Sequence, residues 1–294
     1  MRLFLIWEQD ETYQDYIRPN WEHLNIPTII SDQFDCMAYI WPKVLPKETK
    51  RYFEREWMGE HILQGHGPLC DAYEAKDGAF HAEGDTPAFL HAIPNGLRGT
   101  ENPGWGGWGG RYVQVRNNVW MDPPPGADWK HAEGQWGFSN SWSKQLEDVT
   151  DAEAVAMRTR YFKPLWRWLD AVQNDFAARA DWCVMDYASA NHHPVVRLKT
   201  PLEVQAVPGQ ELVLDASPTT DPDGDELRFR WWPYSGAGTY SGAELVESHL
   251  PVTKITIPQD AVAGQEIHLI CEVTDAGEPP LTRYRRVVIR IHSL

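Results

Sequence analysis

The segment Leu3-Phe4-Leu5-Ile6-Trp7, closed by the polar residues Glu8-Gln9-Asp10, sets the architecture of the first part of the chain. A short continuous apolar run that ends in polar residues is typical of a buried parallel strand leading into a loop. A helix is expected over residues 12–24, and Pro27-Thr28-Ile29-Ile30 indicates a second short strand. This order of strand, helix and strand predicts an open α/β sheet with parallel strands.

The middle of the chain contains fewer regular patterns. Residues 48–64 are expected to be helical, whereas residues 65–149 are rich in Gly, Pro and Trp, which predicts ordered loops with short elements. Thr150 is a candidate N-cap for a helix that begins at Asp151. Pro164 is expected to break or restart this helix, which then presents an apolar stripe made of Leu165, Trp168, Leu169, Val172 and Phe176.

The last hundred residues alternate between apolar and polar positions, which predicts β-structure. Strands are expected at 212–214, 227–232, 253–257, 267–273 and 284–291, separated by Pro, Gly and Asp turns. Strands of this number and spacing indicate an immunoglobulin-like β-sandwich. We therefore predict two domains, an α/β domain at 1–190 and an all-β sandwich at 194–294, with the boundary near 191–194.

The composition excludes several classes of partner. The chain has 294 residues and a formal net charge of −15, which disfavours nucleic acid and anionic membranes. No apolar run approaches the roughly 20 residues that cross a bilayer, and residues 1–7 do not resemble a signal peptide. The 15 Trp residues suit either sugar stacking or core packing. The four cysteines lack metal-binding or redox spacing, so free thiols are expected.

A polar cluster at His81, Glu83 and Asp85 precedes the apolar segment 88–90. An imidazole and two carboxylates at this spacing could ligate a metal or act as acid and base. The alternative is that Asp85 or Thr86 only caps a helix, because Pro87 suits the first turn. The residues alone leave both interpretations open.

Two further motifs each allow a functional and a structural interpretation. Trp105, Trp108 and Arg111 belong to a Trp-Gly loop that would form either a sugar-stacking rim or a loop packed into the core. The segment 221–225 places Asp221, Asp223 and Asp225 in one tight turn, which would hold a hard cation such as calcium or serve as a polar turn. An EF-hand is excluded, since Trp232 occupies the position of its bidentate Glu.

Several longer segments resemble a known family. The similar segments of the first domain are Gly65–Leu69, Glu83–Leu90, Ile93–Leu97, Trp105–Tyr112 and Asn174–Arg179, and those of the second are Asp221–Asp225, Gly238–Tyr240 and Val273–Tyr284. Together they resemble the rear portion of nucleoside hydrolase-like proteins that are associated with cellulose binding in bacteria and carry a C-terminal immunoglobulin-like domain.

The resemblance implies a relative of calcium-dependent enzymes that hydrolyse N-ribosyl bonds. It implies that Asp85 is a calcium ligand, that His81 or Glu83 stands in for the acid, and that Trp105, Trp108, Arg111 and Asn95 bind substrate. The expected ligand is a carbohydrate or a nucleoside-like small molecule. The family would also place the protein in the periplasm or outside the cell.

The chain departs from this family at its front, where no aspartate cluster is expected before Asp85. Three alternatives follow: the chain is a fragment, it is completed by another chain or a homo-oligomer, or it has lost hydrolysis. Our leading hypothesis is a nucleoside hydrolase-like protein with Asp85, supported by Glu83 and His81, at the carboxyl edge of the sheet. The competing hypothesis is a non-catalytic carbohydrate-binding or adhesion module.

Overall fold

The computed structural model describes residues 2–73, 75, 77–81, 85–130, 136–245 and 248–293. Their packing divides the chain into two compact units. The first unit comprises residues 1–63, 72–93 and 99–170, and the second comprises residues 64–71, 94–98 and 171–294. Unlike the predicted domains 1–190 and 194–294, these units assign most of helix α9 (Leu169–Asp181) to the unit that contains the sandwich.

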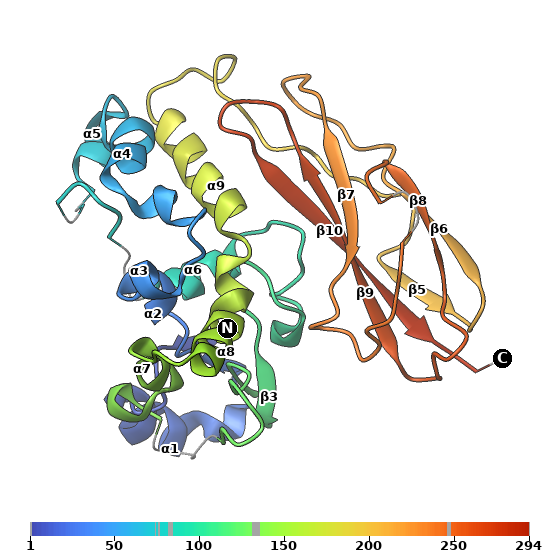
Figure 1. The fold of residues 1–294 in the computed structure, drawn as a ribbon, viewed down its shortest axis with the longest axis horizontal. Coiled ribbons are helices and arrows are strands. Elements are labelled where there is room, and N and C mark those ends of the chain that lie inside the picture. The colour runs from blue at the N-terminus through green and yellow to red at the C-terminus, as the bar shows by residue number, and fades with distance from the viewer. Residues whose placement is uncertain are drawn as a thin grey trace. The chain divides into compact units, whose positions relative to one another are not determined.

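The first unit is built on a four-stranded mixed sheet, of which Figure 1 labels strand β3. The strands β1 (Leu3–Leu5), β2 (Thr28–Ile30), β4 (Val119–Met121) and β3 (Val113–Arg116) lie in that order. Strands β1, β2 and β4 are parallel, whereas β3 is antiparallel to β4. The predicted parallel pair at the start of the chain is therefore confirmed, and two more strands come from the segment that was expected to be mostly loop.

Short helices surround this sheet. Residues 12–24 are helical as predicted, as a π-helix at Thr12–Ile17, α1 at Arg18–Trp21 and a 3-10 turn at Glu22–Leu24. The segment 48–64 is also helical, with a 3-10 turn at Lys50–Phe53, α4 at Arg55–Met58 and a π-helix at Gly59–Leu63. The other helices are α2 (Asp35–Ala38), α3 (Trp41–Val44), α5 (Gly67–Asp71), α6 (Thr86–Ala92), α7 (Trp142–Glu147) and α8 (Ala152–Trp166), with 3-10 turns at Pro103–Trp105 and Phe138–Asn140.

Helix α8 begins and ends differently from the prediction. Its N-cap is Asp151, not Thr150, because the side chain of Asp151 accepts a hydrogen bond from the backbone N–H of Ala154 at 2.9 Å. Pro164 lies inside the helix, which continues to Trp166 before α9 begins at Leu169. The prediction that the helix restarts was correct, but the break falls just after Pro164.

The second unit contains the predicted β-sandwich (Figure 1). One sheet has the order β5 (Glu203–Ala206), β10 (Thr282–Ile291), β9 (Glu266–Thr274) and β7 (Arg228–Pro233). The other pairs β6 (Glu211–Asp215) with β8 (Val252–Thr256). Strand β10 is antiparallel to β9 and parallel to β5, so it lies inside its sheet. The fold class is therefore a mixed α/β unit with an immunoglobulin-like sandwich.

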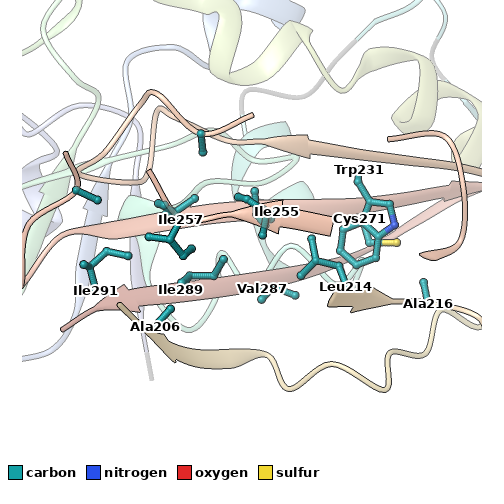
Figure 2. Packing of buried hydrophobic residues seen from close by; sticks show 14 of the residues in the cluster. Ala206, Leu214, Ala216, Trp231, Ile255, Ile257, Cys271, Val287, Ile289 and Ile291 are labelled. Carbon is teal, nitrogen blue, oxygen red and sulfur yellow. The ribbon is translucent and has the colours of Figure 1, made fainter. Parts of the chain in front are cut away.

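The core of the sandwich is formed by alternate residues of the strands, as Figure 2 shows. Leu214 of β6 and Ile255 of β8 are completely buried, and Trp231 of β7 is only 1% exposed. Strand β8 alternates strictly between exposed and buried positions, which is the pattern of a strand with one face on a core. This regular alternation explains why the sandwich was readable from the sequence.

All four cysteines are free thiols, with Cys183 exposed and the other three buried. Within the described parts of the chain, no helix combines the length and the apolar character needed to span a membrane.

Candidate functional site at the carboxyl edge of the sheet

Two aspartates follow neighbouring parallel strands of the first unit. Asp32 lies two residues beyond β2, and Asp122 follows β4 directly. The carboxyl ends of parallel neighbours meet at one edge of the sheet, where open α/β sheets bind their ligands. The Oδ2 atom of Asp122 accepts hydrogen bonds from the backbone N–H of Asp32 at 2.6 Å and of Gln33 at 3.1 Å. The two loops are thus joined through a carboxylate.

Helices α7 and α8 supply the partners of Asp32. Its Oδ2 atom accepts hydrogen bonds from the backbone N–H of Ser143 and from the hydroxyl of Tyr161, both at 2.8 Å. The hydroxyl of Ser143 donates to the backbone carbonyl of Asp32 at 2.5 Å. Ser141 caps α7 by accepting from the N–H of Lys144, which fixes the first turn that carries Ser143.

Both carboxyl groups are enclosed by protein. Burial raises the pKa of Asp32 despite its hydrogen bonds, and it raises the pKa of Asp122 well above the ordinary value. The Oδ1 atoms of both residues are buried and have no hydrogen-bond partner among the described residues. Two such groups in proximity favour a state in which one carboxyl keeps its proton and the other is ionised.

A cavity of about 370 Å³ lies in the same unit. Its aromatic lining is Trp129, Trp136 and Trp142, and its polar lining is Asp128, Lys130, Asn140 and Gln145. The carbonyl of Trp136 accepts hydrogen bonds from the backbone N–H groups of Glu8 and Gln9, which follow β1. Trp142 directly precedes Ser143, which binds Asp32 after β2. Two walls of the cavity are therefore anchored to loops at the carboxyl edge.

Of the predicted group at residues 81–85, His81 and Asp85 lie in the described part of the chain. Asp85 occupies the N-cap position of α6, and its exposed side chain makes no capping hydrogen bond. The backbone of His81 exchanges two hydrogen bonds with the hydroxyl of Tyr73. Glu83 lies outside the described residues. Asp85 thus directly precedes a helix, and both its position at the carboxyl edge and the chemical role of the group stay predictions.

The predicted substrate-binding residues do not form one rim. Trp108 is only 1% exposed, so its ring packs in the interior and does not line a mouth. A Cβ at Gly109 would lie 2.3 Å from the carbonyl of Pro87, so this loop packs closely against α6. Trp105 and Arg111 are half-buried in the same loop.

Asn95 has a structural environment in the second unit. It is buried, its side-chain Oδ1 accepts from the N–H of Leu97 at 3.0 Å, and its carbonyl accepts from the N–H of Tyr284 at 2.9 Å. These contacts give Asn95 a structural role, and its substrate-binding role stays a prediction.

The acidic turn of the sandwich is a group that could hold a metal ion. One side-chain oxygen from each of Asp221, Asp223 and Asp225 lies within 4.8 Å of the others. Among the described residues, this is the one group of three or more His, Cys, Asp and Glu side chains with that spacing. Asp32 and Asp122 belong to no such group, so the described residues of the first unit do not reproduce the calcium cluster implied by the family resemblance.

Asp32, Asp122, Ser143 and Tyr161 were not identified from the sequence. The available signal was an aspartate shortly after each of two apolar runs, Thr28-Ile29-Ile30 and Val119-Trp120-Met121. The second run has three residues within a segment rich in Gly and Pro, which concealed it as a strand.

Comparisons with known proteins agree with this architecture. Residues 1–112 match the nucleoside hydrolase-like domain of the cellulose-binding protein Sde182, and residues 211–291 match the C-terminal domain of the cellulose-binding protein Sde0182. A comparison with curated proteins found no match.

One solved structure is similar along almost the whole chain. It is a nucleoside hydrolase-related hypothetical protein from Saccharophagus degradans, described as associated with carbohydrate metabolism. The two share 29% identity with a TM-score of 0.69, and the match covers 99% of this chain and 62% of that one. The chain thus spans less than two thirds of the length of this relative.

Two shorter matches concern about a third of the chain. The PKD domain of the KIAA 1837 protein has 16% identity, a TM-score of 0.26 and coverage of 33% of this chain and 87% of its own. The first immunoglobulin domain of mouse SynCAM 2 has 14% identity, a TM-score of 0.21 and coverage of 35% and 97%. The two family models and the structure from Saccharophagus degradans together show that the chain resembles an Sde182-type nucleoside hydrolase-like domain followed by the C-terminal domain of the cellulose-binding protein Sde0182.

Proposed function

We propose that this protein binds a neutral carbohydrate through its first unit, in the cavity lined by Trp129, Trp136 and Trp142. The observation that carries the proposal is the position of this aromatic cavity at the carboxyl edge of a parallel sheet, where the fold places ligands. The descriptions of the matching families, which refer to cellulose binding, support the same class of ligand.

Trp129 is the ring best placed to contact a sugar. Trp136 and Trp142 are 2% and 5% exposed, so they contribute edges, whereas Trp129 is half-buried. Its backbone N–H bonds to the carbonyl of Gly126 in a tight turn, which holds the indole at the cavity. An indole face gives apolar contact to the C–H groups of a pyranose, while the ring adds no charge.

The polar lining suits sugar hydroxyls. The Nε2 of Gln145 donates to the carbonyl of Asn140 at 2.9 Å, which fixes this exposed side chain in the lining of the cavity. Asp128 and Lys130 add an acceptor and a donor of opposite charge. The net charge of −15 disfavours an anionic ligand, so the cavity suits a neutral saccharide better than a phosphorylated one.

Titration calorimetry with cello-oligosaccharides on the full chain tests this proposal. Trp129→Ala removes the stacking face. If the sugar covers roughly 60 Å² of ring at about 25 cal/mol per Å², the loss is about 1.5 kcal/mol, or about tenfold in Kd. The matched control is Trp166→Ala, a half-buried Trp outside the cavity that should leave Kd unchanged. If Trp129→Ala binds the sugar as tightly as wild type, the ligand binds outside this cavity. The sandwich is then the candidate, as in the competing hypothesis.

A second candidate function, hydrolysis of a glycosidic bond of the N-ribosyl type, is favoured by the buried carboxyl pair. A carboxyl whose pKa is raised by burial, as for Asp122, holds its proton more strongly than an exposed carboxyl does, which favours a role as general acid. Asp32 beside it would stabilise developing positive charge on the sugar when ionised. The similarity to a nucleoside hydrolase-related protein supports this chemistry.

The assay for hydrolysis measures release of free base or reducing sugar from nucleosides and cello-oligosaccharides. Asp122→Asn keeps the shape of the side chain but removes the transferable proton, so activity should fall by at least about a hundredfold. Asp85→Asn in the same assay tests the role predicted from the family motif. If activity survives Asp122→Asn and disappears with Asp85→Asn, the site lies at α6; if wild type shows no release at all, the unit binds without hydrolysis.

A further inference from the structure

A short segment from the first half of the chain packs against the end of helix α9. Residues 64–71, which include α5, belong to the same compact unit as most of α9, although the chain on either side of them belongs to the other unit. The ring of His66 bonds to the carboxylate of Asp181 at 3.1 Å, and a Cβ at Gly67 would lie 3.0 Å from the side chain of Val184. The segment therefore lies against the last turn of α9 and the residues that follow it.

Each side of this contact carries a cysteine. Cys70 lies in α5, three residues after Gly67, and Cys183 lies two residues after the end of α9. The side chains of Cys70 and Cys183 are hydrogen-bonded to each other, and the charge of Asp181 also acts on Cys70. Two thiols in side-chain contact meet the first geometric requirement of a disulfide, whose S–S bond is about 2.05 Å long.

The two thiols differ in accessibility. Cys183 is exposed, and its Sγ donates a hydrogen bond to the carbonyl of Arg179 at 3.2 Å, whereas Cys70 is only 7% exposed. Burial raises the pKa of the Cys70 thiol, and the contact with Cys183 raises it further. The other two cysteines, Cys36 and Cys271, are completely buried. A reagent in solution therefore meets Cys183 first, and Cys70 is the thiol placed to react with what is bound there.

We propose that Cys70 and Cys183 form a reversible disulfide, which ties α5 to the end of α9 when the protein meets a small-molecule disulfide such as oxidised glutathione. In the first step, the thiolate of Cys183 attacks one sulfur of the oxidant, forms a mixed disulfide and releases one glutathione thiolate. The thiolate of Cys70 then attacks the sulfur of Cys183, which forms the protein disulfide and releases the second glutathione thiolate. Two protein thiols are oxidised, one small disulfide is reduced, and the two released thiolates take up the two protons.

The bond would stabilise the second unit mainly through the unfolded chain. It would close a loop of roughly 110 residues, from residue 70 to residue 183, and a cross-link over a long loop restricts the unfolded chain strongly. It would also fasten residues 64–71, whose neighbours in the sequence belong to the other unit. The pair would therefore make the attachment of this segment depend on the redox state of the surroundings.

The test uses the full chain, reduced and then freed of reductant, with oxidised glutathione as the probe under native conditions. Wild type should lose two of its four thiols, and peptide mapping by mass spectrometry should find Cys70 and Cys183 in one cross-linked pair. The oxidised protein should unfold about 5 to 10 °C above the reduced protein. Dithiothreitol should restore all four thiols and the lower Tm.

Single variants separate the two steps. In Cys70→Ser, the mixed disulfide at Cys183 should accumulate, with one glutathione per chain and no comparable rise in Tm. In Cys183→Ser, a change at an exposed position, the remaining thiols should stay reduced. Cys36→Ala removes a buried thiol of the other unit and is the matched control, which should form the disulfide as wild type does.

Three results would overturn the proposal. The first is a wild type that keeps all four thiols in the presence of oxidised glutathione. The second is a mixed disulfide that persists at Cys183 in wild type as it does in Cys70→Ser, because Cys70 then does not reach the sulfur of Cys183. The third is a cross-link that includes Cys36 or Cys271 in place of either member of the pair.

Discussion

Replacement of Asp175 provides a quantitative test of how α9 is fastened within the second unit. The carboxylate of Asp175 accepts hydrogen bonds from Arg283 of β10 at 2.9 Å and from Arg179 at 2.7 Å, and it contacts the ring of His193 at 2.6 Å. The side chains of Asp175 and Arg283 are 4% and 13% exposed, whereas that of Arg179 is 45% exposed. The pair with Arg283 therefore dominates.

Asp175→Asn should lower the free energy of unfolding by about 3 kcal/mol. Breaking a buried ion pair leaves an uncompensated charge and costs about 3 to 5 kcal/mol, and the low end applies here because Arg179 and solvent retain part of the interaction. For a unit of this size the loss corresponds to a fall in Tm of about 6 to 12 °C. Thermal unfolding followed by near-UV circular dichroism measures it, with exposed Glu244→Gln as the control for net charge.

The effect should depend on pH with a defined sign. Burial alone would raise the pKa of Asp175, but the hydrogen bond with His193 and the charges of Arg283 and Arg179 outweigh it and hold the pKa below its ordinary value. Its contribution is thus complete above the unfolded pKa of about 3.9 and is lost as the pH falls through the lower folded value. The difference in the free energy of unfolding between wild type and Asp175→Asn should be the same at pH 7 and pH 5 and smaller at pH 3. A gap below about 1 kcal/mol at pH 7, or one independent of pH down to 3, refutes this reasoning.

Three further predictions concern packing and accessibility in the second unit. Trp231→Ala should cost about 3 to 5 kcal/mol in urea unfolding, because this ring is 1% exposed in the sandwich core; a loss under about 1 kcal/mol would contradict that packing. Gly96→Ala should cost at least about 2 kcal/mol, since Gly96 has φ of +94° and a Cβ there would lie 1.9 Å from the carbonyl of Tyr284; a stable variant would show that this approach is looser. Cys183, which is exposed, should react first with a thiol reagent, whereas burial raises the pKa of Cys271 and should delay its reaction until unfolding; equal rates would exclude this difference.

The sandwich was readable from the sequence because its strands are apolar or alternating segments separated by turn residues. Strand β8 alternates strictly between exposed and buried residues, and β9 and β10 contain nine and ten residues. Patterns of this regularity or length are recognisable as strands in the sequence alone. The parallel pairing of β5 with β10 was not predicted, since register between distant strands leaves no local signal.

The candidate site shows the limit of such reasoning more clearly. Asp32 and Asp122 are separated by 90 positions, and only the placement of β4 next to β2 brings them together. Strand β4 has three residues, too few for a period to be measured. Asp85 stands in a distinctive motif and was correctly placed near the start of a helix, but a motif match does not report which edge of a sheet a side chain faces.

The interior position of β10 has a consequence for how the protein is made. Because β10 lies between β5 and β9, neither neighbour has its complete set of backbone partners until residues 282–291 have left the ribosome. In the nascent chain, the edge of β9 that later pairs with β10 therefore has free backbone N–H and C=O groups. An apolar strand with such an edge is prone to pair with other chains. Translation that stalls before residue 282 should yield products that are quickly degraded, and chaperone capacity during synthesis should govern the yield of the mature protein.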